Sequence, residues 1–253
     1  MDVIESIKAL PGSVSYYYED LVSGAREAHA AASPLVAASV IKLPILVEAF
    51  RQMEAGEANP DERFVVDGGC KLPSCGALSY MHDGLEVTFL DLVTLMIILS
   101  DNTATNLVID RLGMERINRT IERLGLSHTV LRRRLFDAEA AGRGLQNTVS
   151  AEDMGKLLGD LYRGEIVSPA ASEAMLQILS DQRLNGKLPF YLHAKGVRIA
   201  HKTGEDYGIT HDVGIVYAKR PFVLCILSEE TDVAQTERAM QDVSLRLYQR
   251  TED

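Results

Sequence analysis

The sequence predicts an α+β fold, a three-layer α/β/α arrangement around an antiparallel five-stranded sheet, with an all-helical lobe inserted into it. Two observations support this prediction. Strand-like runs lie near both ends of the chain, whereas residues 35–184 show mostly helical spacing of apolar residues. We therefore expect an α/β lobe of residues 1–34 and 185–253 and a helical lobe of residues 35–184. At 253 residues and 46% hydrophobic, the chain can bury such a core without disulfides or metals.

Five segments are predicted to form the sheet, and turn residues separate some of them. Val and Tyr dominate residues 13–20, and a Ser23-Gly24 turn leads into the next strand. Near the other end, a short turn at residues 219–221 separates the last two strands. The predicted strands are residues 13–20, 26–31, 197–201, 212–218 and 222–227.

Helices are predicted at both ends of the chain and throughout its middle, because apolar residues recur there at three- and four-residue intervals. Several of these segments are followed by glycine, a common helix stop. The last helix carries Val233, Met240, Val243 and Leu247, as expected for a helix packed on one face of a sheet. The other predicted helices are residues 3–10, 39–55, 88–99, 103–112, 114–124, 151–162 and 168–179.

The composition argues against several classes of partner. A net charge of −10 and a pI near 5.1 do not suit nucleic acid, whose phosphates require Lys and Arg. The most apolar stretch, residues 90–99, is far shorter than the roughly 20 residues that span a bilayer, so we expect no membrane span. The N-terminus lacks the features of a secretory signal, which favours a cytoplasmic protein or, alternatively, an exported one whose leader has been removed.

Cysteine and histidine usage limits the covalent and metal chemistry. Cys70 and Cys75 are close enough in sequence to form one local bridge, and two free thiols are the equal alternative. Cys225 lies in an apolar strand and is expected to be a small buried side chain. The six histidines are scattered without a His-x-His or His-Glu-x-x-His pair, so we expect no metal site and no cofactor.

The first candidate catalytic element is the run Ser39-Val40-Ile41-Lys42 at the predicted start of a helix. A spacing of three places Ser39 and Lys42 on one helix face, one turn apart. A serine hydroxyl is a weak nucleophile until a base takes its proton, and a partly desolvated lysine can be neutral enough to take it. The structural alternative is that Ser39 caps the helix and Lys42 extends to solvent.

The second element is the run Ser100-Asp101-Asn102, which follows an apolar helix. Here Ser100 can relay a proton to the leaving nitrogen of a substrate, and the Asn102 amide can hold a substrate carbonyl. Ordinary capping by polar residues at a helix end is the alternative.

The third element is the run Lys202-Thr203-Gly204-Glu205, at the end of a predicted strand. The lysine would attract a substrate carboxylate, the threonine would hydrogen-bond it, and the glycine would let the substrate backbone lie flat against the strand. The structural alternative is a strand that simply runs into a turn.

Each motif occurs once, in the order that one known catalytic arrangement requires, and together they resemble those of class A serine β-lactamases and their class A-like relatives in the penicillin-recognising serine hydrolase superfamily. The resemblance covers nearly the whole chain and implies one β-lactamase/transpeptidase-like domain over residues 1–253. It implies a small-molecule β-lactam or similar acyl substrate, whose ring is opened through a covalent acyl-enzyme on Ser39 that is then hydrolysed. It adds no cofactor.

Position by position, the resemblance also implies the roles of the motif residues. Ser39 would attack the acyl carbon, Lys42 would belong to the proton network around it, and Ser100 would pass a proton to the departing nitrogen. The backbone amides of Ser39 and Glu205 would form the oxyanion hole. The implied substrate-binding positions are Asn102, Lys202, Thr203, Gly204 and Glu205.

Residues 131–148 depart from the class A pattern, because the Glu-x-x-Leu-Asn motif that activates the deacylating water is absent. Asp137 and Glu139 are the candidate replacements for its glutamate. The alternative is that both carboxylates form salt bridges to the arginines at 132–134. Without a base for the water, the protein would acylate and stall as a penicillin-binding protein or sensor, or act as a D-Ala-type peptidase or esterase. The sequence does not specify an oligomeric state.

Overall fold

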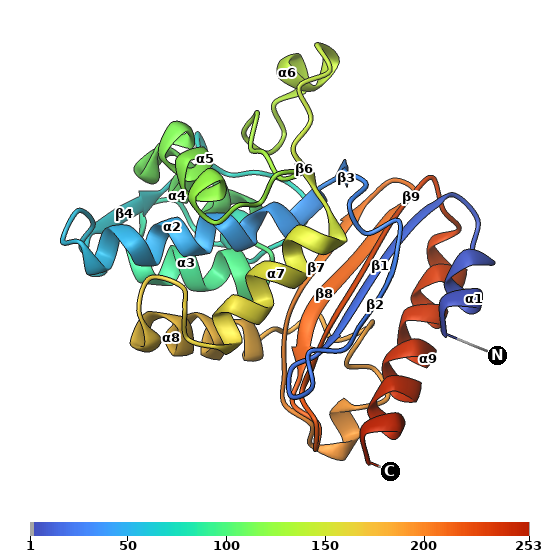
Figure 1. The fold of residues 1–253 in the computed structure, drawn as a ribbon. Helices are drawn as coiled ribbons and strands as arrows, with labels where there is room; N and C mark the ends of the chain where they lie inside the picture. Colours follow the sequence, from blue (N-terminus) through green and yellow to red (C-terminus); the bar gives the residue numbers. More distant parts are fainter. Residues whose placement is uncertain (1–2, 253) are drawn as a thin grey trace.

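The computed structural model describes residues 3–252 and is organised around a five-stranded antiparallel sheet (Figure 1). The strand order is β2-β1-β9-β8-β7, so strands from both ends of the chain lie side by side. The predicted α+β class and five-stranded sheet are therefore confirmed. The strands are β1 (Ser13–Asp20), β2 (Arg26–His29), β7 (Ile199–Asp206), β8 (Ile209–Val216) and β9 (Phe222–Glu229).

Both faces of the sheet are covered by helices. Tyr16 packs in an apolar cluster with residues of α1 (Val3–Lys8) and α9 (Val233–Glu252), whereas Tyr17 packs in the larger cluster of the helical lobe. Successive side chains of a strand point to opposite faces, so a strand that is apolar at both positions needs cover on both. In Figure 1, α1 and α9 lie on one side of the sheet and α7 (Ala151–Tyr162) lies on the other.

The predicted helices of the middle of the chain form within a few residues of their predicted bounds. Their starts follow from capping: Thr88 and Asp91 form a capping box at the start of α3, and Ser150 caps α7. Besides α7, the predicted helices of this lobe are α2 (Lys42–Glu54), α3 (Phe89–Ile98), α4 (Asn102–Leu112), α5 (Met114–Arg123) and α8 (Pro169–Ser180), whereas the five-residue helix α6 (Ala138–Gly142) was not predicted.

Several short elements within the helical lobe and beside the sheet were not predicted. Strands of two to four residues are too short to show an alternating pattern, and single 3₁₀ turns have no apolar period of their own. They are the strand pairs β3 (Leu35–Val36) with β6 (Thr148–Val149) and β4 (Arg63–Val66) with β5 (Leu85–Thr88), and the 3₁₀ helices η1 (Ala38–Ile41), η2 (Leu78–Tyr80) and η3 (His193–Lys195).

Several predicted strand ends were wrong. β8 begins at Ile209 and ends at Val216 rather than spanning residues 212–218, and β9 continues to Glu229. β7 does not stop before the Lys-Thr-Gly motif but runs through it to Asp206, because β8 pairs with it along its whole length, for example Thr203 opposite Asp212. β2 ends early at His29, since the next residue, Ala30, has a positive φ of 48° that does not fit a strand. The extension of β7 places the whole third motif inside the sheet.

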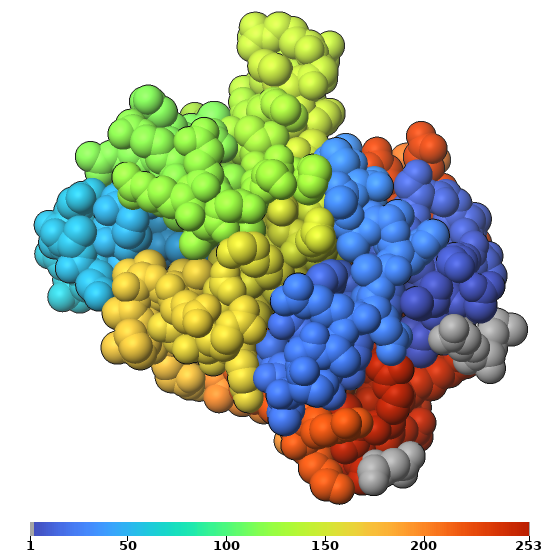
Figure 2. All heavy atoms as spheres, in the orientation of Figure 1, coloured from blue at the N-terminus to red at the C-terminus, as the bar shows by residue number. Residues whose placement is uncertain are grey.

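Residues 131–147, which we call the projecting segment, stand away from the rest of the molecule. The short helix α6 lies near its tip, and Figures 1 and 2 both show this yellow-green segment rising above the surface. Between residues 3 and 252, no helix has both the length and the apolar character needed to cross a membrane. All three cysteines are free thiols, so Cys70 and Cys75 form no bridge, and Cys225 is buried as expected.

Candidate active site

Ser39 is presented by the 3₁₀ helix η1, which leads directly into α2. The backbone turns at Ala38, whose φ of 42° lies in the left-handed region, and the fully buried Val40 anchors the turn in the core. β7 packs against η1, and space is tight at Gly204, where a Cβ would lie 3.0 Å from His211 Cδ2 and 3.1 Å from Val40 Cγ2. The glycine therefore lets the third motif approach the serine closely, a role that the sequence interpretation did not include.

Lys42 is fully buried, so the alternative in which it extends to solvent is wrong. Its Nζ donates hydrogen bonds to the Ser100 backbone oxygen at 2.8 Å, to Ser100 Oγ at 3.0 Å and to Asn102 Oδ1 at 3.1 Å. None of these three acceptors is a carboxylate. Burial, together with the charge of Lys202, holds the pKa of Lys42 well below its ordinary value. A neutral amine is therefore accessible at this position, which is what a base for Ser39 requires.

The Ser100 hydroxyl joins the two lysines of the site. Lys202 Nζ donates to Ser100 Oγ at 3.1 Å and to the Thr203 backbone oxygen at 2.8 Å. Because both lysines donate to this hydroxyl, its own proton is free to point elsewhere. Ser100 has a positive φ of 52°, a conformation that costs on the order of 1 kcal/mol for a residue other than glycine. Burial lowers the pKa of Lys202 to about 7, although the Asp212 carboxylate opposes this shift.

Asp101 fastens a loop over the site. Its Oδ2 accepts from the backbone amides of Ala77 and Leu78 at 2.7 and 2.9 Å, and its Oδ1 caps α4 by accepting from Ala104 at 2.9 Å. Gly76, with a φ of 116°, lies against this carboxylate, and a Cβ there would come within 2.3 Å of the Asp101 Cγ. The middle residue of the second motif is therefore a structural anchor for the loop that carries Cys75.

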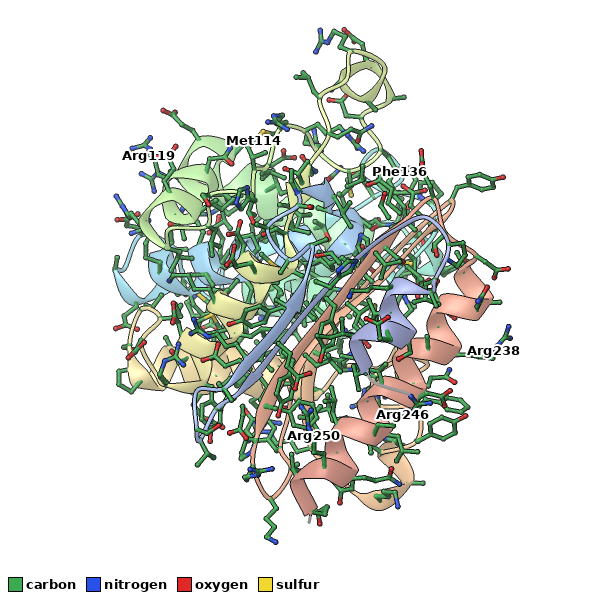
Figure 3. All side chains as sticks on the ribbon, turned by 45° about the vertical axis from the view of Figure 1, so that its right-hand side comes forward. Met114, Arg119, Phe136, Arg238, Arg246 and Arg250 are labelled. Atoms are coloured by element: carbon green, nitrogen blue, oxygen red, sulfur yellow. The ribbon has the colours of Figure 1, made fainter. Side chains whose placement is uncertain are left out.

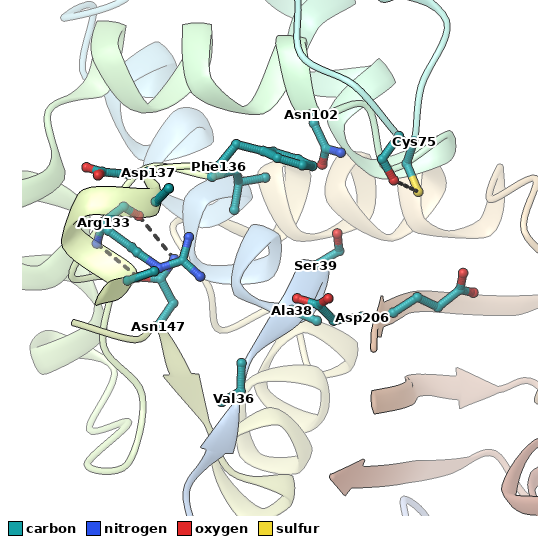
Figure 4. A pocket seen from close by; sticks show the side chains of 15 residues that line it. Val36, Ala38, Ser39, Cys75, Asn102, Arg133, Phe136, Asp137, Asn147 and Asp206 are labelled. Carbon is teal, nitrogen blue, oxygen red and sulfur yellow. Dashed lines mark hydrogen bonds between the residues drawn. The ribbon is translucent and has the colours of Figure 1, made fainter. Parts of the chain in front are cut away.

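Ser39 lines a cleft of about 540 Å³ between the motif residues, this loop and the projecting segment. Figure 4 shows the Ser39 hydroxyl pointing into the cavity. Asn102 Nδ2 uses one proton to donate to the Pro73 backbone oxygen at 3.2 Å, which leaves the other for a ligand. The sequence-predicted residues that line the cleft are Ser39, Asn102, Asp137 and Glu205. Those that lie buried beside it are Lys42, Ser100, Lys202, Thr203 and Gly204.

The two predicted water-activating carboxylates lie in different surroundings. Asp137 lines the cleft, but its Oδ1 caps α6 by accepting from the Ala140 amide at 2.9 Å, and Figure 4 shows its carboxylate pointing away from Ser39. Glu139 does not line the cleft; its side chain is 84% exposed and pairs with Arg143 at 3.2 Å. The structure therefore brings only Asp137 to the cleft wall.

The expected salt bridges from these carboxylates to the arginines at 132–134 do not form. Arg133 donates to Gln146 Oε1, and Arg134 pairs with Asp110 at 2.9 Å. Arg132 donates to the backbone oxygen of Gln146. The arginines thus hold the two ends of the projecting segment together and tie its base to α4, so that alternative was wrong.

Phe136 is a cleft residue that the sequence interpretation missed. It has a positive φ of 60°, is 51% exposed and lines the cavity. Figure 3 places it at the base of the projecting segment, and Figure 4 shows its ring reaching across the cleft toward Asn102. A bulky side chain in this conformation is rare, and an exposed aromatic residue in an irregular loop leaves no pattern in the sequence that would single it out.

Two buried histidines, His201 and His211, form hydrogen bonds within the sheet beside the cleft. His201 Nδ1 lies 2.9 Å from Asp212 Oδ1, which links β7 to β8 directly before Lys202. His211 Nδ1 accepts from the Ser228 amide, so its Nε2 carries the proton and donates to the Val36 oxygen at 2.8 Å. Burial lowers the pKa of His211 to about 4, which keeps this ring neutral. Polar residues within apolar strands were the available signal for both.

Across residues 3–252, no cluster of three or more His, Cys, Asp or Glu side chains is arranged to hold a metal ion. The model of the beta-lactamase enzyme family matches residues 2–251 of this chain. No curated protein matches it.

Solved structures match over the whole chain. A beta-lactamase from Sphaerobacter thermophilus DSM 20745 is 29% identical with a TM-score of 0.91, and the match covers 100% of this chain and 98% of that one. A structure of PBP-A is 31% identical with a TM-score of 0.88, over 99% of this chain and 94% of that one. An L158E mutant of PBP-A, an acyl-enzyme complex with penicillin G, is 30% identical with a TM-score of 0.87 over the same shares.

Proposed function

The chain belongs to the beta-lactamase enzyme family, and we propose that it opens β-lactam rings through a covalent acyl-enzyme on Ser39 and then hydrolyses that ester. It is an enzyme of the serine β-lactamase type. The observation that carries the proposal is the junction at Ser100, where the buried amines of Lys42 and Lys202 both meet one hydroxyl beside the serine that faces the cleft.

The acylation half builds on these contacts and on the spacing of three residues that places Ser39 and Lys42 one helical turn apart. Neutral Lys42 takes the proton of the Ser39 hydroxyl as its oxygen bonds to the carbonyl carbon, and the ring C–N bond then breaks. The departing nitrogen takes the Ser100 proton, which the Lys42 ammonium replaces through its 3.0 Å contact. Every proton is thereby accounted for, and Lys42 returns to the neutral state.

Binding of the substrate uses the third motif and the second. Lys202, the cation beneath the cleft, and Thr203 bind the ring carboxylate of the substrate. The free N–H of Asn102 holds the side-chain carbonyl. Backbone amides of Ser39 and Glu205 stabilise the oxyanion, and such a donor is worth about 3 kcal/mol. The net charge of −10 supports a small molecule rather than a nucleic acid as ligand.

Hydrolysis of the acyl-enzyme is assigned to a water activated by Asp137, the candidate carboxylate that lies in the cleft wall. Its Oδ1 is occupied by the cap of α6, which leaves Oδ2 for this role. Because the carboxylate points away from Ser39 in the resting structure, it must turn toward the ester before water can attack. Deacylation is therefore expected to be the slower half of the reaction.

Steady-state hydrolysis of a chromogenic cephalosporin tests the proposal. The unmodified protein should turn over many equivalents of substrate, and Ser39→Ala should abolish the colour change. Ser33→Ala, which alters an exposed serine in a turn outside the cleft lining, should keep full activity. Equal turnover by Ser39→Ala would reject Ser39 as the nucleophile, and a burst without turnover would identify a penicillin-binding protein instead of a hydrolase.

A further inference from the structure

The two walls of the cleft differ in net charge. Arg133 and Asp137 belong to the projecting segment, whereas Glu205 and Asp206 belong to the end of β7. All four border the cavity that Ser39 faces. A carboxylate without a partner in such a cleft attracts cations, so the balance of charge on each wall bears on which substrates enter.

The wall of the projecting segment is balanced. The Arg133 guanidinium donates to Gln146 Oε1 at 2.9 Å and to the Arg134 backbone oxygen at 3.2 Å, both uncharged acceptors. Its positive charge is thus not neutralised by these contacts, and Asp137 supplies one negative charge on the same wall. The two charges offset each other for a ligand in the cavity.

The wall of β7 is not balanced. Glu205 is neutralised by the buried Lys187, whose Nζ lies 3.0 Å from its Oε1. Asp206 accepts one hydrogen bond, from the Tyr207 amide to its Oδ1 at 2.7 Å, and within residues 3–252 it has no ion-pair partner. Its Oδ2 is free. In Figure 4, Asp206 lies beside Ala38 and across the cavity from Arg133.

The position of Asp206 along β7 relates it to the carboxylate site. Residues two apart in a strand share a face, so Lys202, Gly204 and Asp206 follow one another along the side of β7 that packs against η1. The rise of a strand separates the Cα atoms of Lys202 and Asp206 by roughly 13 Å. A cationic and an anionic position therefore flank the glycine that faces the nucleophile turn.

From this arrangement we infer that the cleft selects acyl substrates whose side chain carries an ammonium group next to the carbonyl of the side-chain amide, and that Asp206 recognises that ammonium. The inference rests on the proposed function, because it takes the ring carboxylate to lie at Lys202. A zwitterionic substrate then lies along β7 with each charge beside its opposite. Asp206 is a specificity-determining residue that acts on the substrate side chain and takes no part in bond breaking.

Three penicillins provide a matched test. Benzylpenicillin, ampicillin and carbenicillin share the ring system and the phenyl group and differ at one carbon, which bears hydrogen, ammonium or carboxylate. The test is made at mildly acidic pH, where the amine is protonated. There kcat/KM for acylation should be highest for ampicillin, lower for benzylpenicillin and lowest for carbenicillin, with roughly a threefold decrease at each step. Added salt should reduce the differences in kcat/KM among the three penicillins, because salt screens charges in a cleft that is open to solvent.

Asp206→Asn keeps the shape of the side chain and its bond to the Tyr207 amide while removing the charge. The ratio of ampicillin to carbenicillin should then fall by roughly tenfold, to near one. Asp61→Asn is the matched control, since it removes the same charge from an exposed turn that does not line the cleft, and it should leave the ratio unchanged. Equal rates for the three penicillins in the unmodified protein, or an unchanged ratio in Asp206→Asn, would overturn the inference.

Equilibrium binding to Ser39→Ala separates this inference from the proposed function. If no penicillin acylates the unmodified protein, the proposed function fails, yet calorimetric binding to Ser39→Ala still reports the ammonium preference. Tighter binding of ampicillin than of carbenicillin, lost in the Ser39→Ala, Asp206→Asn double variant, supports the inference. Equal binding of the two penicillins rejects it.

Discussion

The motif cluster and the projecting segment face the same cleft but are built in opposite ways. In the cluster, Lys42 is fully buried and makes three hydrogen bonds to the second motif. In the projecting segment, α6 has five residues, and Glu139 is 84% exposed. The groups needed to form the acyl-enzyme are thus held by buried contacts before substrate arrives, whereas the group assigned to hydrolyse it lies on a loop that projects from the surface. Acylation and deacylation should therefore respond to mutation independently.

Replacing Lys42 should have the largest effect. Lys42→Met keeps the volume of the side chain but removes the base, so the acylation rate should fall by about 10² to 10⁴-fold. The fold should persist, because a buried amine is replaced by an apolar group. Stopped-flow measurement with a chromogenic cephalosporin reports the rate, and Lys156→Met, on the exposed face of α7, is the control. A fall of less than tenfold in Lys42→Met would show that the buried network is not the acylation machinery.

Asp137→Asn tests the other region. Asparagine is as good a helix cap as aspartate, so α6 should remain intact. Deacylation should slow by roughly 10² or more, the usual size of a general-base effect, while acylation is retained. Single-turnover kinetics separate the two rates. Glu139→Gln, which changes a carboxylate outside the cleft, should alter neither, and a reversed result would move the base to Glu139.

The pH dependence of acylation tests the role of Lys202 in the motif cluster. Lys202 is a cation below its pKa of about 7 and loses that charge as the pH rises through this value. Acylation by a substrate with a ring carboxylate should therefore decline on the alkaline side, by up to about tenfold per pH unit. Lys202→Arg, which stays charged, should remove this decline. An identical profile for both proteins would exclude Lys202 as its source.

The smallest effects are expected in the free energy of unfolding, when the helix caps Asp101 and Asp137 are removed. Asp101→Ala removes the cap of α4 and two further bonds to the overlying loop, at a cost of about 2–3 kcal/mol. Asp137→Ala removes one bond at a partly exposed helix of five residues, at a cost of about 0.5 kcal/mol. Denaturant unfolding of both variants measures the difference. Equal costs would contradict the contrast between the buried cluster and the exposed helix of the projecting segment.

The difference between the regions also decides what the sequence could predict. Lys42, Ser100 and Lys202 belong to motifs that the structure brings into contact, so their grouping could be proposed without coordinates. Long amphipathic helices and the apolar strands were predictable because periodicity reports burial. The end of β7 was misplaced, because Lys202 and Thr203 are polar residues held in a strand by their partners in β8.

The contacts of the projecting segment could not be predicted from the sequence. Asp137 directly follows Phe136, whose φ of 60° is unusual for an aromatic residue, and no pattern in the sequence indicates this backbone turn. The partners of Arg133 and Arg134 are Gln146 and Asp110, and neither pairing follows from a local pattern. Loop conformation, rather than composition, determined each of these contacts.

Intact-protein mass spectrometry at short times after mixing with a β-lactam, with turnover recorded in parallel, tests whether Ser39 carries a transient acyl group. One substrate mass should be bound at Ser39 within the first turnover, and this adduct should decay as hydrolysis continues and be absent in Ser39→Ala. Sustained hydrolysis by Ser39→Ala, or an adduct on Ser39 that never decays, would contradict the proposed acyl-enzyme mechanism.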